Sequence, residues 1–347
     1  MTIDLIIPVY KPDKYFLEMI EGMTKQSVGI NRIIVINTEQ KYFDRLVYST
    51  KLLDEHKSLE IRHISKKEYD CGKTRNSGVK LSDADFFIIM SPKAVPVGKE
   101  VISKLAKAFE DESVAVAFAR PVAVDSASEA EKYVRRYYFP EDSAVHSSKD
   151  VDSLGWTAYM NTNICAMYRR TVFDELDGFL NHVIANEDII YAAKAVNAGY
   201  KISYVADAVV VYTDSPDEKE SMKQAFDFGV SVVKNPEVFD PDVIKETAKR
   251  LDKLILNHLR RNGFRSEVFE YRRLSAARKK GFGKGIKYKK LTDFDIQKYT
   301  GNPEYWRMDE ILRDRKSIDS HAGYGRSEAE REMISTPPVR KNKNTEE

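Results

Sequence analysis

Short hydrophobic runs alternate with amphipathic stretches along the N-terminal third of the chain. Five of these runs have the length and β-branched content of buried strands, and the stretches between them repeat hydrophobic residues at helical spacing. Strands that alternate with helices indicate an α/β fold, in which a mostly parallel sheet is flanked by helices. We predict strands at Ile3–Val9, Arg32–Asn37, Leu59–Ile64, Phe86–Met90 and Val114–Ala119.

The stretches between these strands predict helices. Asp13 can cap a helix over Lys14–Lys25, and further helices are expected near Lys41–Leu53, at Gly72–Leu81 and at Lys99–Phe109. In sheets of this kind, ligands bind at the carboxyl ends of the strands. The site is therefore expected in the segments that follow the first four strands.

The pattern changes at Ser126, where a polar, aromatic and irregular stretch runs to Asp152. We predict that residues 1–233 form an α/β domain and that residues 234–322 form a basic, mostly helical C-terminal extension. The charged stretch 323–347 holds few apolar residues, so we expect a disordered tail. The later elements are expected at Asn161–Tyr168 and Tyr204–Tyr212 (strands), at Thr171–Leu176 and Glu187–Asn197 (helices), and over Glu218–Arg278 (two or three helices).

Composition narrows the class of protein. The chain has 347 residues, of which 42% are hydrophobic and 32% charged, as in ordinary soluble proteins. No run reaches the length of a transmembrane helix, and the N-terminus lacks the features of a signal peptide. Two cysteines, Cys71 and Cys165, are too few for a disulfide framework, which favours a cytoplasmic location.

The net charge of +2 is unevenly distributed. Residues 245–290 hold 16 Lys or Arg and 4 Asp or Glu, a local net charge of +12 that leaves −10 on the rest. This block suggests an anionic partner, although a solvated helical surface explains it equally well. Its segment Arg272–Lys290 carries interleaved Phe282, Ile286 and Tyr288, which suits peripheral binding to an anionic membrane surface. No signature of nucleic-acid binding accompanies it, so nucleic acid is not an expected partner.

Several motifs occur in a characteristic order between the first strand and the C-terminal helices. They are Ile6-Ile7-Pro8-Val9-Tyr10, Tyr69–Asn76, Asn163–Arg170, Gly178-Phe179, Asn186-Glu187-Asp188 with Ala192-Ala193-Lys194, and Phe226–Val230. Together they resemble the GT-A-fold glycosyltransferases of family 2, especially bacterial rhamnosyltransferase-like members. The resemblance implies that residues 1–233 form a GT-A domain. It also implies transfer of a sugar from a nucleotide-diphosphate sugar to an acceptor hydroxyl, usually with inversion.

The resemblance assigns donor-binding roles at the ends of the first two strands. Pro8 and Tyr10 are expected to contact the base or ribose, although Tyr10 could simply cover the sheet edge. Asn37 and Glu39 follow the second strand, where family members usually carry an Asp that binds the base. Asn37 can still offer an amide hydrogen bond.

Arg75 lies in the first turns of a helix that follows Gly72. Its guanidinium and the free backbone N–H groups there can form an anion site for the donor diphosphate. The alternative is a structural salt bridge with Asp70. Trp156 is a candidate stacking platform for an acceptor sugar, or else a buried core residue.

Glu187 and Asp188 open a predicted helix, and the family's catalytic base is a carboxylate of this motif. An inverting transfer needs a base that takes the proton of the acceptor hydroxyl. Adjacent carboxylates cannot share one helix face, so we predict Asp188 as the base and Glu187 as the second candidate. The alternative is that both only favour the helix dipole.

Three segments depart from the family pattern. Ser91-Pro92-Lys93 stands where members typically carry an Asp that holds a divalent metal on the donor diphosphate. Thr213-Asp214-Ser215 stands where a His often completes that metal site, although Asp214 could offer one carboxylate. Arg120-Pro121-Val122 replaces the usual Arg-Gln-Leu. Residues 91–93 therefore do not support Mg²⁺ or Mn²⁺, and we predict no metal ligand.

Three explanations of Lys93 stay open. Together with Arg75 and Arg120, Lys93 could stabilise the leaving diphosphate without a metal. The chain could instead be an inactive relative that acts as a binding or scaffolding subunit, or it could use a different donor. The retained Glu187-Asp188 favours the first explanation, and the several donor-side departures favour the second. We predict an enzyme of cell-surface polysaccharide synthesis that acts on a glycan or lipid-linked acceptor.

Overall fold

Every strand that the hydrophobic pattern predicts forms in the computed structural model, which describes residues 1–47, 50 and 59–307. The strand over Leu59–Ile64 and the strand over Phe86–Met90 have the predicted bounds. Two additional three-residue strands, β5 and β7, were not predicted. The strands are β1 (Ile3–Tyr10), β2 (Arg32–Thr38), β3 (Leu59–Ile64), β4 (Phe86–Met90), β5 (Ala94–Pro96), β6 (Val114–Ala123), β7 (Ala144–His146), β8 (Cys165–Arg169) and β9 (Lys201–Tyr212).

These strands form one sheet in the order β3-β2-β1-β4-β8-β6-β9-β5, and β7 pairs with β9. The pairings of β1 with β2 and β4, of β2 with β3, and of β6 with β9 are parallel. Strands β8, β5 and β7 run the opposite way to their neighbours. Six of the nine strands in the described residues therefore point in one direction, and the predicted mostly parallel α/β fold is confirmed.

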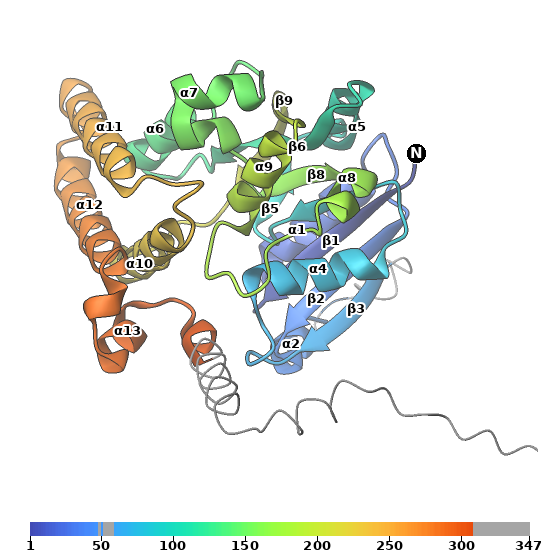
Figure 1. Cartoon of the computed structure of the whole chain (residues 1–347), viewed down its shortest axis with the longest axis horizontal. Coiled ribbons are helices and arrows are strands. Elements are labelled where there is room, and N and C mark those ends of the chain that lie inside the picture. The colour runs from blue at the N-terminus through green and yellow to red at the C-terminus, as the bar shows by residue number, and fades with distance from the viewer. Residues whose placement is uncertain (48–49, 51–58, 308–347) are drawn as a thin grey trace, which may run out of the picture. The chain divides into compact units, whose positions relative to one another are not determined.

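Helices cover both faces of this sheet (Figure 1). Successive residues of β1 enter two different cores, because side chains along a strand alternate between faces. Ile6 packs in the core that holds Val79 of α4 and residues of α8 and α9. Leu5 and Ile7 pack in the core on the other face, against α1, α2 and α5. The helices are α1 (Lys14–Thr24), α2 (Gln40–Val47), α4 (Cys71–Leu81), α5 (Val101–Lys107), α8 (Arg170–Glu175) and α9 (Glu187–Asn197).

The segment that looked irregular contains a helix, α6 (Glu129–Tyr138). Ser128 caps it by accepting a hydrogen bond from the backbone N–H of Glu131 (3.2 Å). A Ser followed three residues later by a Glu is a helix-start signal that was present in the sequence. Short helical segments then follow, among them α7 (Val151–Leu154) and the 3₁₀ segment Gly155–Tyr159.

Four helices with assigned bounds follow β9 in the described residues, and two of them, α11 and α12, pack against α6 (Figure 1). Residues 1–302 form one compact unit and residues 303–347 a second. The predicted boundary at residue 233 stays a prediction, and the predicted tail at 323–347 lies outside the described residues. The four helices are α10 (Glu218–Lys234), α11 (Pro241–Arg261), α12 (Arg265–Gly285) and α13 (Asp293–Tyr299).

Helix α12 runs seven residues beyond the Arg278 at which the predicted helices ended, and glycines in its last turns let it touch α10. A Cβ on Gly281 would lie 2.0 Å from the backbone oxygen of Met222, and one on Gly285 would lie 2.2 Å from that of Phe226. Only glycine permits this approach of two backbones.

Among the described helices, none has the length and apolar character needed to cross a membrane.

Candidate active site

Glu187 and Asp188 begin α9, as predicted. The residue before them, Asn186, has a φ of 65°, a left-handed conformation that Asn tolerates better than most residues. This sharp turn directs the chain from the preceding loop into the helix. The two carboxylates therefore lie at the positive end of the helix dipole, next to the carboxyl-end region of the sheet.

Asp188 is held by backbone groups on both carboxylate oxygens. The N–H of Asn163 donates to its Oδ2 (3.0 Å), and the N–H of Ile189 donates to its Oδ1 (2.9 Å). Burial, and then the negative charge of Glu187, raise the pKa of the Asp188 carboxyl above its ordinary value. The result is an oriented carboxylate with the raised basicity that a general base needs.

Glu187 is almost completely buried and is committed to other protein groups. Its Oε1 lies 3.1 Å from Nε of Arg75 and accepts a hydrogen bond from the side-chain amide of Asn163 (3.0 Å). Arg75 also donates to the backbone oxygen of Cys71 (2.8 Å). The salt bridge foreseen for Arg75 is thus made with Glu187; Asp70 instead caps α4 by accepting from the N–H of Lys73.

Three buried polar side chains support the two carboxylates and were not predicted as site residues. The Tyr168 hydroxyl donates to Oδ1 of Asn163 (2.6 Å) and accepts from the amide of Asn161 (2.9 Å). Tyr168 and Asn163 belong to the motif Asn163–Arg170, so their place in the sequence was visible while their partners were not. This network fixes the amide that holds Glu187 and the backbone that holds Asp188.

Lys93 pairs with Asp214. Its Nζ lies 2.5 Å from the Asp214 Oδ1, and the Lys93 side chain is 44% exposed. The backbone oxygen of Lys93 accepts from both the N–H and the hydroxyl of Thr213. Two of the three segments that depart from the family pattern are therefore in direct contact.

Arg120 lies on β6 and forms an ion pair with Glu141 at 3.4 Å. Its Nε is buried and makes no hydrogen bond within the described residues. Arg75, Lys93 and Arg120, predicted together as diphosphate ligands, each pair with a different carboxylate.

Tyr10, at the end of β1, lies in a cluster of tyrosines and lysines. Its ring meets that of Tyr42 edge-on, with 5.6 Å between centroids. The ammonium groups of Lys11 and Lys66 lie 5.3 and 5.0 Å from the centre of the Tyr10 ring. Pro8 is half-buried in β1, two residues before. Aromatic faces beside cations are suited to a nucleotide, which combines a flat base with negative charge.

Asn37 and Glu39 differ sharply in exposure. The Asn37 side chain is 0% exposed, and its amide nitrogen lies 3.0 Å from the Nδ1 of His63. Glu39 is half-buried and accepts a hydrogen bond from the backbone N–H of Lys66 (3.0 Å). Of this predicted pair, Glu39 is the residue with a surface that a ligand can reach.

Trp156 lies in the 3₁₀ segment after α7 and is half-buried. Its ring packs against Phe239, with 6.3 Å between ring centroids. The side chain thus belongs in part to the core and keeps some exposed surface.

The residues present do not fit a metal ion held by protein side chains. Within the described parts of the chain, no three His, Cys, Asp or Glu side chains gather closely enough to hold one. At the position of the expected metal ligand stands Lys93, whose ammonium occupies the nearest carboxylate, that of Asp214.

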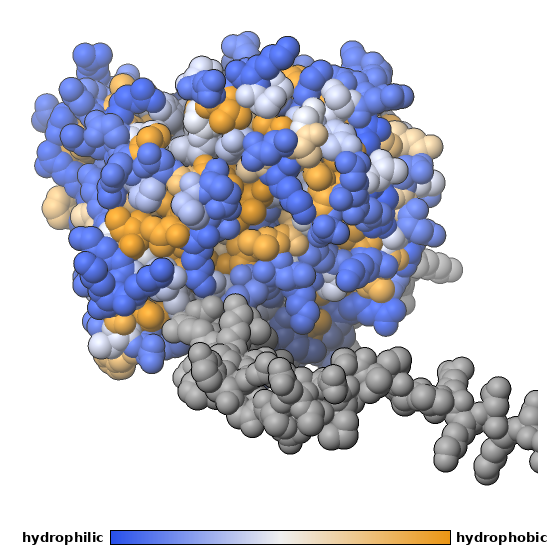
Figure 2. Space-filling model, viewed as in Figure 1, coloured by the Kyte–Doolittle hydropathy of each residue, from blue (hydrophilic) through white to orange (hydrophobic). Residues whose placement is uncertain are grey.

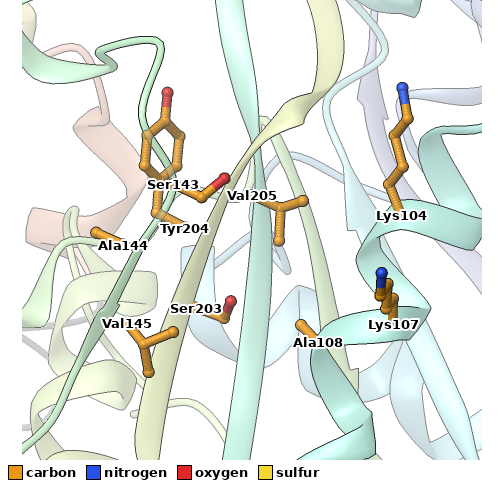
Figure 3. A pocket seen from close by; sticks show the side chains of 9 residues that line it. All are labelled: Lys104, Lys107, Ala108, Ser143, Ala144, Val145, Ser203, Tyr204 and Val205. Carbon is orange, nitrogen blue, oxygen red and sulfur yellow. The ribbon is translucent and has the colours of Figure 1, made fainter.

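A shallow pocket of about 270 Å³ opens between α5, β7 and β9 (Figure 3). Lys104 and Lys107 lie on one side of it and Ala144 and Val145 on the other. None of the predicted site residues lines this pocket, so it is separate from the candidate active site.

Known proteins resemble this chain in sequence and in fold. The profile of a family described as "Glycosyl transferase family 2" matches residues 4–177. The O-antigen chain rhamnosyltransferase RfbN of Salmonella typhimurium is 33% identical over 231 residues, which are 66% of this chain and 72% of that protein. The O-antigen chain rhamnosyltransferase WbaN of Salmonella anatum is 28% identical over 234 residues, 67% of this chain and 72% of that protein.

Among solved structures, the mannosyltransferase PcManGT from Pyrobaculum calidifontis, in complex with GDP-Man and Mn²⁺, superimposes with a TM-score of 0.56. The two chains are 13% identical, and the match covers 83% of this chain and 88% of that one. This likeness shows the fold, which is the predicted GT-A fold. The family profile and the 33% identical rhamnosyltransferase RfbN establish that the chain belongs to glycosyltransferase family 2.

Proposed function

We propose that this glycosyltransferase inverts the anomeric carbon and that Asp188 is its catalytic base. The acceptor hydroxyl attacks the anomeric carbon of a nucleotide-diphosphate sugar while its proton passes to the Asp188 carboxylate. The new bond joins that oxygen to the sugar, and the bond between the sugar and the diphosphate breaks. The orientation of Asp188 by two backbone N–H groups carries this proposal, because proton transfer requires a fixed base.

Glu187 has a positioning role in this scheme. Its carboxylate is buried and bound by Arg75 and Asn163, so an acceptor hydroxyl cannot reach it as readily as it reaches Asp188. Its negative charge also raises the pKa of Asp188. Asp188 therefore remains the first choice of base, as the sequence suggested.

We further propose that the leaving diphosphate is stabilised by protein cations without a metal ion. Lys93 is half-exposed and forms its ion pair with Asp214, which a diphosphate could replace. The exchange would leave the ammonium paired in both states, so little desolvation energy is lost when the donor binds. Tyr10, Lys66 and Glu39 are the proposed contacts for the nucleoside.

The related O-antigen chain rhamnosyltransferases suggest the substrate class. We propose that the chain adds a sugar, with rhamnose as the first candidate, during synthesis of a cell-surface polysaccharide. Its acceptor would be a glycan or its lipid-linked precursor. Trp156 is the proposed platform for an acceptor sugar.

A test uses the purified full chain with UDP-, GDP- and dTDP-sugars and with glycan and lipid-linked acceptors. Each reaction is run with a chelator, with Mg²⁺ and with Mn²⁺. We expect a glycosyl product that forms at a similar rate under all three conditions. Strict dependence on Mn²⁺ would contradict the metal-free step, while binding of a donor without any product would favour an inactive, scaffolding subunit.

The basic block suggests a location on the inner face of a membrane. Hydrophilic residues cover much of α11 and α12 in Figure 2, whereas hydrophobic residues gather between these helices and the sheet. Phe282 packs against Phe228 of α10, with 5.7 Å between ring centroids, so it does not serve as an exposed anchor. In the segment 272–290 of this block, the exposed basic residues are Arg272, Arg273, Lys279, Lys280, Lys284, Lys287, Lys289 and Lys290.

We propose that these side chains hold the enzyme to anionic lipids by charge alone. Vesicles with and without anionic lipid can be sedimented with the protein at two salt concentrations. We expect binding to anionic vesicles that weakens as salt rises, because exposed charges are screened. Equal sedimentation with neutral and anionic vesicles would refute the electrostatic contact.

A further inference from the structure

Two arginines from separate helices meet near the end of β9. Arg135 lies on α6 and Arg278 on α12, and these helices pack together in the group of C-terminal helices (Figure 1). The Arg135 guanidinium lies over the ring of Tyr212, 4.9 Å from its centre. Arg135 is close enough to Arg278 for their like charges to repel. The charge of Arg135 therefore lies at the end of the last long strand, and Arg278 is its neighbour.

The carboxylate nearest to Arg135 is only a weak partner. Glu131 lies one helical turn before it, with 3.9 Å between its Oε1 and Nη2 of Arg135. The other oxygen of Glu131 accepts a hydrogen bond from the Ser215 hydroxyl (2.8 Å). The Nε of Arg135 is buried and makes no hydrogen bond to any described residue. The hydrogen-bonding capacity of this guanidinium is thus largely unused.

Arg278 is half-buried, and burial lowers its pKa. Within the described residues it forms no ion pair and no side-chain hydrogen bond that would offset this burial. The carboxylates that act on Arg278 electrostatically are Asp252 and then Glu131. Asp252 already binds Lys279 (2.6 Å), Tyr271 (2.5 Å) and Ser275 (2.7 Å). A cation that is partly removed from water without an ion pair or hydrogen bond of its own loses hydration energy that nothing nearby replaces. Arg135 and Arg278 therefore form an anion-seeking pair.

This pair adjoins the candidate active site. The hydroxyl of Tyr212, the residue under Arg135, interacts with Ser91 and Asp214. Asp214 is the partner of Lys93. The N–H of Ser91 donates to the backbone oxygen of Ile164 (3.0 Å), the residue after the Asn163 that holds the base. The arginines thus approach the same strand ends from the side of the C-terminal helices.

We propose that Arg135 and Arg278 bind a diphosphate group, carried either by the sugar-nucleotide donor or by a lipid-linked acceptor. Two guanidinium groups offer the forked donors that phosphate oxygens accept best. The proposal rests on the proposed function for the identity of the ligand, but the anion site itself does not require that transfer occurs. It assigns the helical extension a share in substrate binding.

Calorimetric titration of the full chain with inorganic pyrophosphate tests the site. We expect Arg135→Gln and Arg278→Gln each to weaken binding by about tenfold, the loss of a charge-assisted hydrogen-bonded contact. The matched controls are Arg136→Gln, the exposed neighbour on α6, and Arg265→Gln, an exposed residue on α12. We expect less than a twofold change in both controls. Unchanged binding in the two test variants overturns the proposal, as does an equal loss in the controls.

Titration with UDP, GDP and dTDP separates the two sources of the diphosphate. If the tightest-binding nucleotide loses affinity in parallel with pyrophosphate, the site holds the donor. If only pyrophosphate binding falls, the site belongs to the acceptor. Asp188→Asn should retain full pyrophosphate affinity, so a failure of the proposed catalytic step can be told apart from a failure of this site.

Thermal unfolding provides a second readout in case a variant folds poorly. Pyrophosphate should raise the Tm of the wild type and of both controls, because a ligand that binds only the folded state stabilises it. It should leave the Tm of Arg135→Gln and Arg278→Gln nearly unchanged. A pyrophosphate-induced rise that persists in both variants would show a merely structural role for the two arginines.

Discussion

The two halves of the candidate site are built in opposite ways. The base half consists of Asp188, Glu187, Asn163 and Arg75, and the donor half consists of Tyr10, Lys66, Lys93 and Asp214. In the base half, carboxylates are bound by backbone N–H groups, an amide and a guanidinium, all largely buried. In the donor half, lysines with flexible side chains lie beside exposed rings or form a partly exposed ion pair.

The difference reflects what each half has to do. A base must hold one geometry and a tuned pKa, which burial and fixed hydrogen bonds provide. A donor site must admit and release a highly charged molecule, and solvated ammonium groups can exchange partners without stranding a buried charge. Substitutions should therefore have large effects in the base half and smaller effects in the donor half.

The largest effect is expected for Asp188→Asn. Because the amide cannot take a proton, the turnover number should fall by about 1,000-fold, within the range for general-base catalysis. The control is Asp152→Asn, an exposed residue of α7. Product formation measured at saturating donor checks the prediction. Near-normal turnover in Asp188→Asn would assign the base to another residue.

Arg75→Ala should leave the buried Glu187 carboxylate without its ion-pair partner. The ion pair spans 3.1 Å between side chains that are only 16% and 7% exposed, so its loss should cost about 3 kcal/mol of unfolding free energy. The pair of Arg62 and Glu60 has the same 3.1 Å separation, but Arg62 is 60% exposed. Arg62→Ala should cost less than about 1 kcal/mol. Denaturant titration compares them; equal losses would remove the distinction between buried and exposed pairs.

Activity and stability should depend on pH in opposite directions through Asp188. Its pKa is raised by burial and by Glu187. Between the ordinary aspartate value of about 3.9 and the raised value, the folded chain keeps a proton that the unfolded chain releases. The contribution of Asp188 to the unfolding free energy therefore falls as pH rises through this window.

Turnover should instead rise with pH over the same window, by about tenfold per unit on the acidic limb, since only the deprotonated carboxylate accepts a proton. Rate profiles and denaturant titrations at matched pH values provide the measurement. Asp188→Asn supplies the reference for stability. A wild-type stability profile that coincides with that of Asp188→Asn would contradict the raised pKa.

The two members of the Lys93–Asp214 pair should respond with opposite signs. Lys93→Ala removes a cation and should weaken nucleoside diphosphate binding by about tenfold. Asp214→Asn removes the competing anion and should leave binding equal or a few-fold tighter. Lys99→Ala, at an exposed position, is the control. Titration with nucleoside diphosphates in the presence of a chelator measures the dissociation constant of each variant. Weaker binding in Asp214→Asn would mean that Asp214 itself contacts the donor.

Local patterns in the sequence predicted most of the fold. The buried strand β4 and the helix α9, which ends just before Gly199, depend on residues close in sequence, so their bounds could be predicted. The charged and aromatic segment Glu129–Tyr138 concealed α6, because its apolar residues pack on other helices instead of on the sheet. The reversed direction of β8 was also not predicted, since strand direction is decided by the path of the whole chain.

In the candidate site, too, local features could be predicted from the sequence and contacts between distant segments could not. The motif Glu187-Asp188 could be recognised from the sequence, but its partners could not. Lys93 and Asp214 are 121 positions apart, and both had been judged separately as departures. Arg75 was predicted to bind the donor diphosphate, with a salt bridge to the nearby Asp70 as the alternative, and its ion pair is with Glu187. Contacts between distant segments depend on topology, which no local pattern contains.

The glycine contact between α10 and α12 bears on how such a chain can diversify. Gly281 and Gly285 leave no room for any larger side chain against α10. The exposed positions on the same helix, such as Arg272 and Lys280, have no such constraint. Substitutions at these exposed positions can therefore change the surface charge of α12 to suit a new acceptor or membrane, while the glycine contact keeps the axis of the helix in place.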